Sequence, residues 1–198
     1  MSELPLIYLC RHGQTDWNAE RRLQGQSDIP LNGLGRTQAQ RNGRYLRNVL
    51  GAEAGAFLFL SSPMSRAFDT MRIIRHEIGF PTEEFARDAR LAEIHFGDWQ
   101  GLTLADMQAA DAGLYERRER DKWHFVPPGD GAESYETLAN RVAPVFAGLP
   151  GPAIVTAHGG VTRAFLRRFA GFSEEEAAHI DVPQDRILRF EHGTISWV

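Results

Sequence analysis

Three short apolar stretches, each followed directly by polar residues, constrain the fold of this chain more than any other feature. Residues 6–10, 56–60 and 153–157 are largely apolar, aromatic or β-branched and have the length of buried strands. Segments with helical spacing separate them, which predicts an α/β fold. If the three strands lie parallel, the residues that follow them meet at one rim of the sheet, where open α/β sheets bind their ligands.

Several helices are expected around these strands. Asn32 can cap a helix that ends at about residue 50, and further helices are expected at about residues 64–78, 103–112, 133–146 and 161–169. Ser173 and Glu176 form a capping-box pattern that opens another short helix, and two β-like runs, 186–191 and 194–198, follow it. This alternation predicts a sheet covered by helices on both faces. The apolar positions of the first long helix include Leu34, Ala39, Tyr45, Leu46 and Val49.

The composition is typical of one soluble globular domain. The chain has 198 residues, 42% hydrophobic and 24% charged, with a formal net charge of -4. This charge gives no reason to expect nucleic-acid or membrane partners, because both favour a basic surface. The single cysteine, Cys10, excludes an internal disulfide and a cysteine-based zinc site, and is expected to be buried. No targeting segment is visible, so we expect a cytoplasmic protein.

Arginine and histidine side chains follow the strand-like stretches. Arg11 and His12 follow the first, Arg66 lies shortly after the second, and His158 follows the third. Histidine can act as a nucleophile, a general base or a metal ligand, and guanidinium groups bind phosphate through paired hydrogen bonds. Arg11-His12-Gly13 alone would favour a buried structural histidine. Two arginines and two histidines on one rim indicate a site for a phosphoryl group.

These residues belong to a longer series of motifs, and with that series the chain resembles the histidine phosphatase superfamily, also called phosphoglycerate-mutase-like. The motifs, in chain order, are Arg11-His12-Gly13 with Thr15 and Asn18, Gln24-Gly25, Leu31-Asn32, Ser62-Pro63, Arg66-Ala67 with Thr70, Glu93 within residues 91–101, Glu133-Ser134 and His158-Gly159. The resemblance implies a three-layer α/β/α fold with a mostly parallel central sheet and one antiparallel edge strand. It also implies one domain over residues 1–198, with a helical cap region at about 103–130.

The resemblance implies that His12 is the nucleophile and forms a phosphohistidine intermediate. To attack phosphorus, His12 must present an unprotonated ring nitrogen, and the positive charges of Arg11 and Arg66 favour that neutral form. Arg11, Arg66 and His158 would then stabilise the charge on the phosphoryl oxygens. Phosphate-binding roles are further expected for Asn18, Gln24, Gly25, Glu93 and Gly159.

Glu93 is the predicted proton donor to the leaving group. A carboxyl group serves as an acid at neutral pH when burial or a neighbouring anion, here the bound phosphate, raises its pKa. The same carboxylate can then activate water. The alternative is that Glu93 is an ordinary surface acid. Gln24 and Ser27 could hydrogen-bond the substrate or its phosphate, or could equally have simple loop roles. Metal ions and cofactors are not required by this mechanism.

Residues 91–101 favour the phosphatase branch, and hence a metal-independent phosphomonoesterase acting on a small phosphorylated metabolite. One alternative is a phosphoglycerate mutase that uses 2,3-bisphosphoglycerate, because Arg117, Arg118 and Arg120 fall where cationic residues of such a mutase would lie. Residues 116–122 fit either a solvated helix face or a cationic wall for a second anionic group. A phospho-ligand-binding module without turnover is the remaining alternative. A monomer and a homodimer are both compatible with the sequence.

Overall fold

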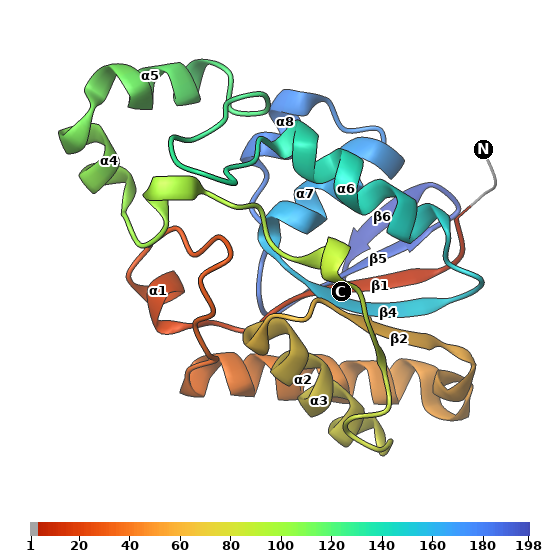
Figure 1. The fold of residues 1–198 in the computed structure, drawn as a ribbon. Helices are drawn as coiled ribbons and strands as arrows, with labels where there is room; N and C mark the ends of the chain where they lie inside the picture. Colours follow the sequence, from red (N-terminus) through yellow and green to blue (C-terminus); the bar gives the residue numbers. More distant parts are fainter. Residues whose placement is uncertain (1–3) are drawn as a thin grey trace.

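The predicted strands form the centre of a six-stranded sheet in the computed structural model, which describes residues 4–198 (Figure 1). The order of the strands across the sheet is β3-β2-β4-β1-β5-β6. The four strands from β3 to β1 are parallel, β5 runs antiparallel to β1, and β6 antiparallel to β5. The strand bounds are β1 Ile7–Arg11, β2 Leu58–Ser61, β3 Ala86–Arg87, β4 Ala153–Ala157, β5 Ile187–Glu191 and β6 Thr194–Trp197.

The sheet confirms the predicted fold class, and two details differ from the sequence expectation. The antiparallel strand β5 lies one place inside the edge, because a tight turn at His192 (φ 48°) and Gly193 (φ 74°) returns the chain as β6. Strand β2 begins at Leu58 rather than residue 56, because the short 3-10 helix η1, Gly51–Ala56, precedes it. Residues 1–3 of the predicted single domain lie outside the described residues.

Helices cover both faces of the sheet, as predicted (Figure 1). Side chains alternate along β1: Tyr8 and Cys10 pack in one core cluster with α2 and α3, whereas Ile7 and Leu9 pack in the other with α6 and α7. The burial of Cys10 agrees with its predicted role as a small core residue. The helices of these layers are α2 Gly33–Leu50, α3 Ser65–Ile78, α6 Tyr135–Ala147, α7 Gly159–Phe169 and α8 Glu174–His179.

Helix α2 begins where the sequence predicts. The Oδ1 atom of Asn32 accepts a hydrogen bond of 2.9 Å from the backbone N–H of Gly35, which makes Asn32 the N-cap. Leu34 and Val49, two of its apolar positions, lie on the exposed face. The buried face instead carries small residues such as Gly43, where a Cβ atom would lie only 2.7 Å from the Cβ of Glu77 on α3. Because α2 packs closely on α3, small residues rather than Leu34 and Val49 occupy the buried face.

A pair of short helices projects beyond the carboxyl ends of the parallel strands (Figure 1). They are α4 Leu104–Ala110 and α5 Ala112–Arg120. The sequence predicted one helix at about 103–112, but Asp111 ends α4 and its side chain caps α5 through the N–H of Leu114, at 2.8 Å. Shorter elements that the sequence did not predict are α1 Asp16–Ala19, η2 Ala89–Leu91 and η3 Gly97–Trp99. Across residues 4–198, no helix combines the length and the apolar character needed to cross a bilayer.

Candidate active site

The carboxyl ends of β1, β2 and β4 lie side by side, so the residues that follow them share one rim of the sheet. Arg11 is paired with Ala157 and Ser61 with Thr156 in the register of these parallel strands. A cavity of about 250 Å³ opens at this rim. Its lining includes Asn18, Gln24, Gly25, Glu93, Gly159 and the basic residues Arg11, Arg21, Arg22, Arg66, Arg118, Lys122 and Arg163, together with His12. The cavity is therefore strongly cationic.

The imidazole ring of His12 is buried and oriented by its own chain. Its Nδ1 atom lies 2.7 Å from the carbonyl oxygen of Gly13, so Nδ1 carries the proton and donates a hydrogen bond to this carbonyl. Nε2 is left unprotonated and accepts a hydrogen bond of 3.2 Å from Nε of Arg66. Burial, followed by the charges of Arg66 and Arg11, holds the pKa of His12 well below its usual value. His12 is thus neutral at neutral pH, with its unprotonated Nε2 held by Arg66.

Arg66 connects His12 to the loop that carries Gln24 and Gly25. Its Nη2 donates to the carbonyl of Gly25 at 2.7 Å, and its Nη1 donates to the carbonyl of Ser27 at 2.8 Å. Burial lowers the pKa of Arg66 to about 10, which leaves it charged at neutral pH. Arg66 therefore holds both the ring of His12 and the adjacent loop in place.

Arg11 and His158 each keep one buried nitrogen without a hydrogen-bond partner within residues 4–198. In Arg11 this atom is Nε, while Nη1 donates to the carbonyl of Val182 at 2.7 Å. In His158 it is Nδ1, while Nε2 lies 2.7 Å from the hydroxyl of Ser62. His158 is fully buried and its ring centroid is 5.2 Å from that of His12, so the two rings are neighbours at this rim. These two nitrogens could donate to a bound anion.

The predicted loop residues have different surroundings. Gln24 is buried, and its Oε1 atom has no partner within residues 4–198. Gly25 has φ +52°, and a Cβ atom there would lie 2.3 Å from the side-chain oxygen of Gln100. Ser27 makes backbone hydrogen bonds: its N–H donates to the carbonyl of Gln24, and its carbonyl accepts from Ile29 and from Arg66. Glycine is thus required at position 25 by backbone conformation and by space.

Gln184 is a site residue that the sequence did not predict. Its Nε2 group donates to the backbone carbonyl of His12 at 3.2 Å and to Oδ1 of Asn18 at 3.0 Å. The same Oδ1 accepts hydrogen bonds from Thr15, so the Nδ2 group of Asn18 is the part that can donate to a ligand. Gln184 lies far from the rim in sequence, before β5, and no local pattern connects it to His12.

Glu93 enters the cavity from the loop between η2 and η3. Its Oε2 atom accepts a hydrogen bond of 3.1 Å from the N–H of Gly160, in the first turn of α7, and its Oε1 accepts one of 3.0 Å from Ile94. The N-terminus of a helix favours negative charge, so α7 fixes this carboxylate beside the histidine rim. Glu93 is the one carboxylate among the described residues that line the cavity.

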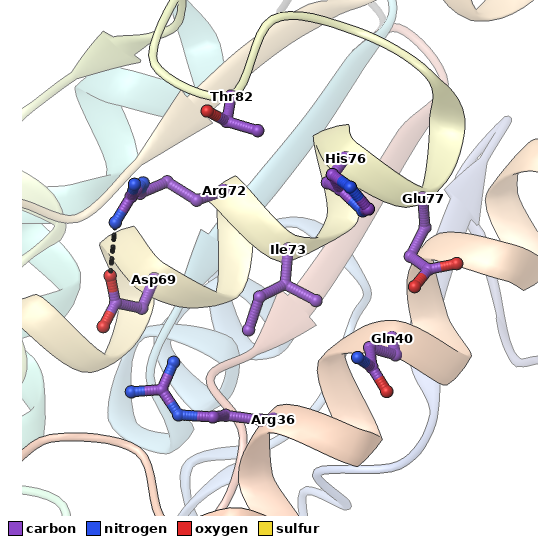
Figure 2. A pocket seen from close by; sticks show the side chains of 8 residues that line it. All are labelled: Arg36, Gln40, Asp69, Arg72, Ile73, His76, Glu77 and Thr82. Carbon is purple, nitrogen blue, oxygen red and sulfur yellow. Dashed lines mark hydrogen bonds and ion pairs between the residues drawn. The ribbon is translucent and has the colours of Figure 1, made fainter.

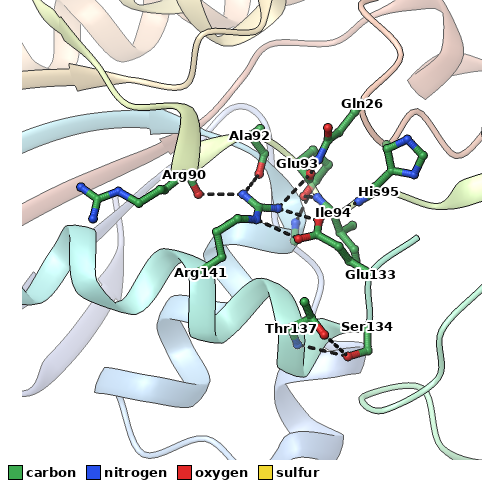
Figure 3. A network of polar contacts seen from close by, with 12 residues as sticks. Gln26, Arg90, Ala92, Glu93, Ile94, His95, Glu133, Ser134, Thr137 and Arg141 are labelled. Carbon is green, nitrogen blue, oxygen red and sulfur yellow. Dashed lines mark hydrogen bonds and ion pairs between the residues drawn. The ribbon is translucent and has the colours of Figure 1, made fainter. Parts of the chain in front are cut away.

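A guanidinium group holds the Glu93 loop against α6 (Figure 3). Arg141 donates to the carbonyls of Arg90 at 2.8 Å, Ala92 at 2.9 Å and Glu93 at 3.3 Å. It also binds both carboxylate oxygens of Glu133, at 2.8 and 2.7 Å, and Glu133 accepts from the N–H of His95. The Glu133-Ser134 motif therefore supports the loop that carries Glu93.

The cap region contributes two basic side chains to the cavity. Arg118, from α5, and Lys122, just after it, line the cavity, whereas Arg117 and Arg120 are exposed and lie outside its lining. Lys122 is followed by Trp123, which stacks on Tyr135 with ring centroids 5.6 Å apart. The two alternatives for residues 116–122 thus both hold in part: one side of the segment is solvated and the other faces the cavity.

Another cavity, of about 260 Å³, lies between α2 and α3 and contains none of the predicted site residues (Figure 2). Its acidic side chains have basic partners: Asp69 with Arg72 at 3.5 Å and Glu77 with Arg44 at 3.1 Å. This cavity therefore offers mixed, largely paired charge and lacks the cationic character of the first.

Within residues 4–198, one group of side chains near the surface has the spacing needed to bind a metal ion. His124, Glu136 and Glu174 bring one potential ligand atom each within 4.8 Å of one another. The sequence spacing did not indicate this group, because Glu174 comes close to His124 only through the fold. Both carboxylates already pair with arginines, Glu136 with Arg168 and Glu174 with Arg167.

The three-layer fold, with a cationic cavity at the carboxyl ends of its parallel strands, defines a phosphoglycerate-mutase-like α/β protein. The chain belongs to the histidine phosphatase superfamily, branch 1, whose family model matches residues 7–198. Members of this superfamily act on small phosphorylated substrates. Both the resemblance and the fold expected from the sequence are therefore confirmed.

Relatives with different activities are similar to this chain. A glucosyl-3-phosphoglycerate phosphatase of Mycolicibacterium vanbaalenii is 34% identical over 83% of this chain and 74% of its own. A 2,3-bisphosphoglycerate-dependent phosphoglycerate mutase of Gloeobacter violaceus is 32% identical over 98% of this chain and 90% of its own. The structure of a mycobacterial glucosyl-3-phosphoglycerate phosphatase complexed with VO3 matches with a TM-score of 0.76 and 31% identity, covering 100% of this chain and 96% of that one.

Proposed function

We propose that the protein is a phosphomonoesterase that hydrolyses a small phosphorylated metabolite through a phosphohistidine intermediate and needs no metal ion. The orientation of His12 carries this proposal. The Nδ1–H group donates a hydrogen bond to the carbonyl of Gly13. This contact leaves Nε2 unprotonated and facing Arg66 in the cationic cavity. This nitrogen needs no other base before it attacks phosphorus, and the N–P bond replaces the hydrogen bond that Nε2 accepts from Arg66.

In the first step, Nε2 of His12 attacks phosphorus, the N–P bond forms, and the ester P–O bond breaks. Glu93 gives its proton to the departing alkoxide oxygen. In the second step, the Glu93 carboxylate takes a proton from water, the water oxygen attacks phosphorus, and the N–P bond breaks. Inorganic phosphate leaves and His12 returns to its starting form.

Charge on the transferring phosphoryl group would be stabilised by donors already in place. Nε of Arg11 and Nδ1 of His158 are buried and have no partner among residues 4–198, and both could donate to phosphoryl oxygens. Asn18 adds its Nδ2 group as a neutral donor. Arg66 contributes its positive charge and holds the ring of His12 in position.

A phosphoglycerate mutase that uses 2,3-bisphosphoglycerate is the second candidate, favoured by the basic residues Arg118 and Lys122 in the cavity. A mutase returns the phosphoryl group to a second hydroxyl, whereas a phosphatase transfers it to water. An enolase-coupled assay on 3-phosphoglycerate separates them. Formation of 2-phosphoglycerate without release of phosphate would replace our proposal by the mutase.

The first test is release of p-nitrophenol from p-nitrophenyl phosphate in excess EDTA. The wild type should turn over and His12→Ala should lose activity by about 10³-fold or more, because the nucleophile is gone. His76→Ala, at an exposed position on α3, is the matched control and should retain wild-type activity. Activity that survives His12→Ala would contradict the assigned nucleophile. Tight binding of phosphorylated ligands with no turnover of any would favour a binding module.

A further inference from the structure

The peptide group between Gly13 and Gln14 makes a hydrogen bond on each side. Its carbonyl oxygen, which belongs to Gly13, lies 2.7 Å from Nδ1 of His12. Its N–H group, which belongs to Gln14, donates a hydrogen bond of 2.8 Å to the side-chain oxygen Oε1 of Gln38. One peptide plane therefore connects the ring of His12 to α2, a helix that contributes no described residue to the lining of the His12 cavity.

The first turns of α2 lie directly against this peptide. A Cβ atom on Gly13 would lie 2.1 Å from the carbonyl oxygen of Gly35, and a Cβ atom on Gly35 would lie 2.1 Å from the carbonyl oxygen of Gln14. Gln38 follows Gly35 by three positions, so the two residues share one face of the helix. The absence of side chains at both contacting glycines therefore brings the backbone of residues 13–14 within reach of Gln38.

The orientation of this peptide plane depends on Gln38. Glycine permits a wider range of backbone dihedrals than other residues, so Gly13 by itself leaves the plane free to rotate. The N–H of Gln14 makes one hydrogen bond within residues 4–198, the one to Gln38. Rotation of the plane would move the Gly13 carbonyl away from Nδ1 of His12, and a hydrogen bond of this kind decides which ring nitrogen carries the proton.

The carbonyl of Gly13 stays in contact with the ring during the proposed reaction. The hydrogen bond from Arg66 to Nε2 is lost when the N–P bond forms, whereas the Nδ1–H group keeps its acceptor. Positive charge develops on the imidazole as Nε2 attacks phosphorus, and a carbonyl oxygen held at Nδ1–H stabilises this charge. An acceptor on the N–H side of the same peptide polarises the carbonyl and strengthens its hydrogen bond.

We propose that Gln38 is a positioning residue for the reaction: it holds the Gly13–Gln14 peptide so that the Gly13 carbonyl keeps the ring of His12 oriented while Nε2 attacks phosphorus. Gln38 lies outside the cavity lining and acts through the peptide rather than through the substrate. This inference rests on the proposed function, in which His12 is the nucleophile. Loss of the Gln38 acceptor should therefore slow phosphoryl transfer to His12 without weakening substrate binding.

The proton on Nδ1 of His12 gives a direct readout by NMR without any substrate. Its signal lies further downfield and exchanges more slowly with water when its hydrogen bond is stronger, and comparison with His12→Asn identifies it. In Gln38→Met, which removes the acceptor at similar side-chain length, the signal should move upfield and exchange roughly tenfold faster. Gln38→Glu keeps an acceptor oxygen and should retain a downfield, slowly exchanging proton. An unchanged signal in Gln38→Met would overturn the proposal.

Kinetics on p-nitrophenyl phosphate provide the second readout. Gln38→Met should lower kcat/KM roughly tenfold, the effect of one neutral hydrogen bond, and should change the inhibition constant of inorganic phosphate by less than about twofold. Gln38→Glu should recover most of the activity. Gln40→Met is the matched control, because Gln40 is half-buried on the same helix but lines the cavity between α2 and α3. Equal kinetics in Gln38→Met and Gln40→Met would contradict the proposal.

The positioning role and the proposed function fail in different ways. Turnover that requires His12 but is the same in Gln38→Met and the wild type would leave the phosphatase and remove the role of Gln38. A changed Nδ1 proton signal in Gln38→Met, with no hydrolysis of any phosphate ester by the wild type, would leave the contact and remove the phosphatase. If Gln38→Met does not fold, Gln38→Asn gives the same two readouts, because its shorter side chain withdraws the acceptor oxygen and stays polar.

Discussion

At the scale of single residues, the carboxylate of Glu93 depends on a glycine in the first turn of α7. A Cβ atom on Gly160 would lie 2.3 Å from Oε1 of Glu93 and 3.1 Å from a methyl group of Leu138. The N–H of the same residue binds the other carboxylate oxygen. The absence of a side chain at position 160 therefore lets the helix end approach the proposed acid closely.

We predict that Gly160→Ala displaces Glu93 and lowers kcat/KM for glycerol 3-phosphate by about 10²-fold, the usual range for a lost general acid. The loss should be smaller for p-nitrophenyl phosphate, whose leaving group departs without a proton. Gly33→Ala, at the start of α2 where a Cβ atom meets no described residue within 4 Å, is the control. Equal losses on the two substrates would show that Glu93 is not the proton donor.

The two histidines of the site, His12 and His158, differ in their position relative to the cavity. His12 and His158 are both buried, but only His12 lines the cavity, and its backbone neighbour Gly13 decides which ring nitrogen is protonated. The sequence predicted both residues for the site. It did not distinguish the ring that lines the cavity from the one that does not, because that depends on ring orientation.

At the scale of elements, the loop that carries Glu93 has little regular structure of its own. It lies between the 3-10 helices η2 and η3, and Arg141 on α6 binds three of its carbonyls as well as Glu133 (Figure 3). Both partners of this ion pair are largely buried. Breaking it leaves one charge and several carbonyl groups without partners.

We expect Arg141→Ala to lower the free energy of unfolding by about 1–3 kcal/mol and to lower kcat, because the position of Glu93 is no longer fixed. Urea unfolding and steady-state kinetics measure the two effects. Arg168→Ala, which removes a more exposed pair with Glu136, should cost no more than about 1 kcal/mol and leave kcat unchanged. Similar results for both variants would show that the Arg141 network is an ordinary surface contact.

At the scale of the whole molecule, the site makes stability depend on pH. Burial, with the charges of Arg66 and Arg11 among the further causes, lowers the pKa values of both His12 and His158 well below the usual value. The unfolded chain binds protons at these histidines below about pH 6.5, whereas the folded protein does not. Folding therefore becomes less favourable as the pH falls through this range.

We predict that the free energy of unfolding decreases by about 1.4 kcal/mol per pH unit for each of these histidines below about pH 6. Urea unfolding between pH 7.5 and 5 measures the slope. His158→Asn should reduce the slope by about one such contribution, and His76→Asn, at an exposed position, should not. A slope that His158→Asn leaves unchanged would contradict a neutral buried His158.

The sequence by itself determined the fold class and the rim. Strands predicted at residues 6–10, 56–60 and 153–157 form β1, β2 and β4, because an apolar run of five residues between breakers is too short for a typical helix and favours a central strand. Parallel order follows from the helices between them, and places Arg11, His12 and His158 together. Asn32 and Ser173 correctly predicted helix starts, because an N-cap hydrogen bond joins residues only two or three positions apart.

Only the tertiary structure decided how the site is supported and where its charges lie. Gln184 and Arg141 act on residues far away in the chain, and a contact across such a separation leaves no periodic pattern in the sequence. Lys122 and Arg118 face the cavity while Arg117 faces solvent, because the docking of α5 and Trp123 selects one side of a segment whose charges look alike in sequence. Local interactions specify elements, whereas long-range packing selects which side chains meet.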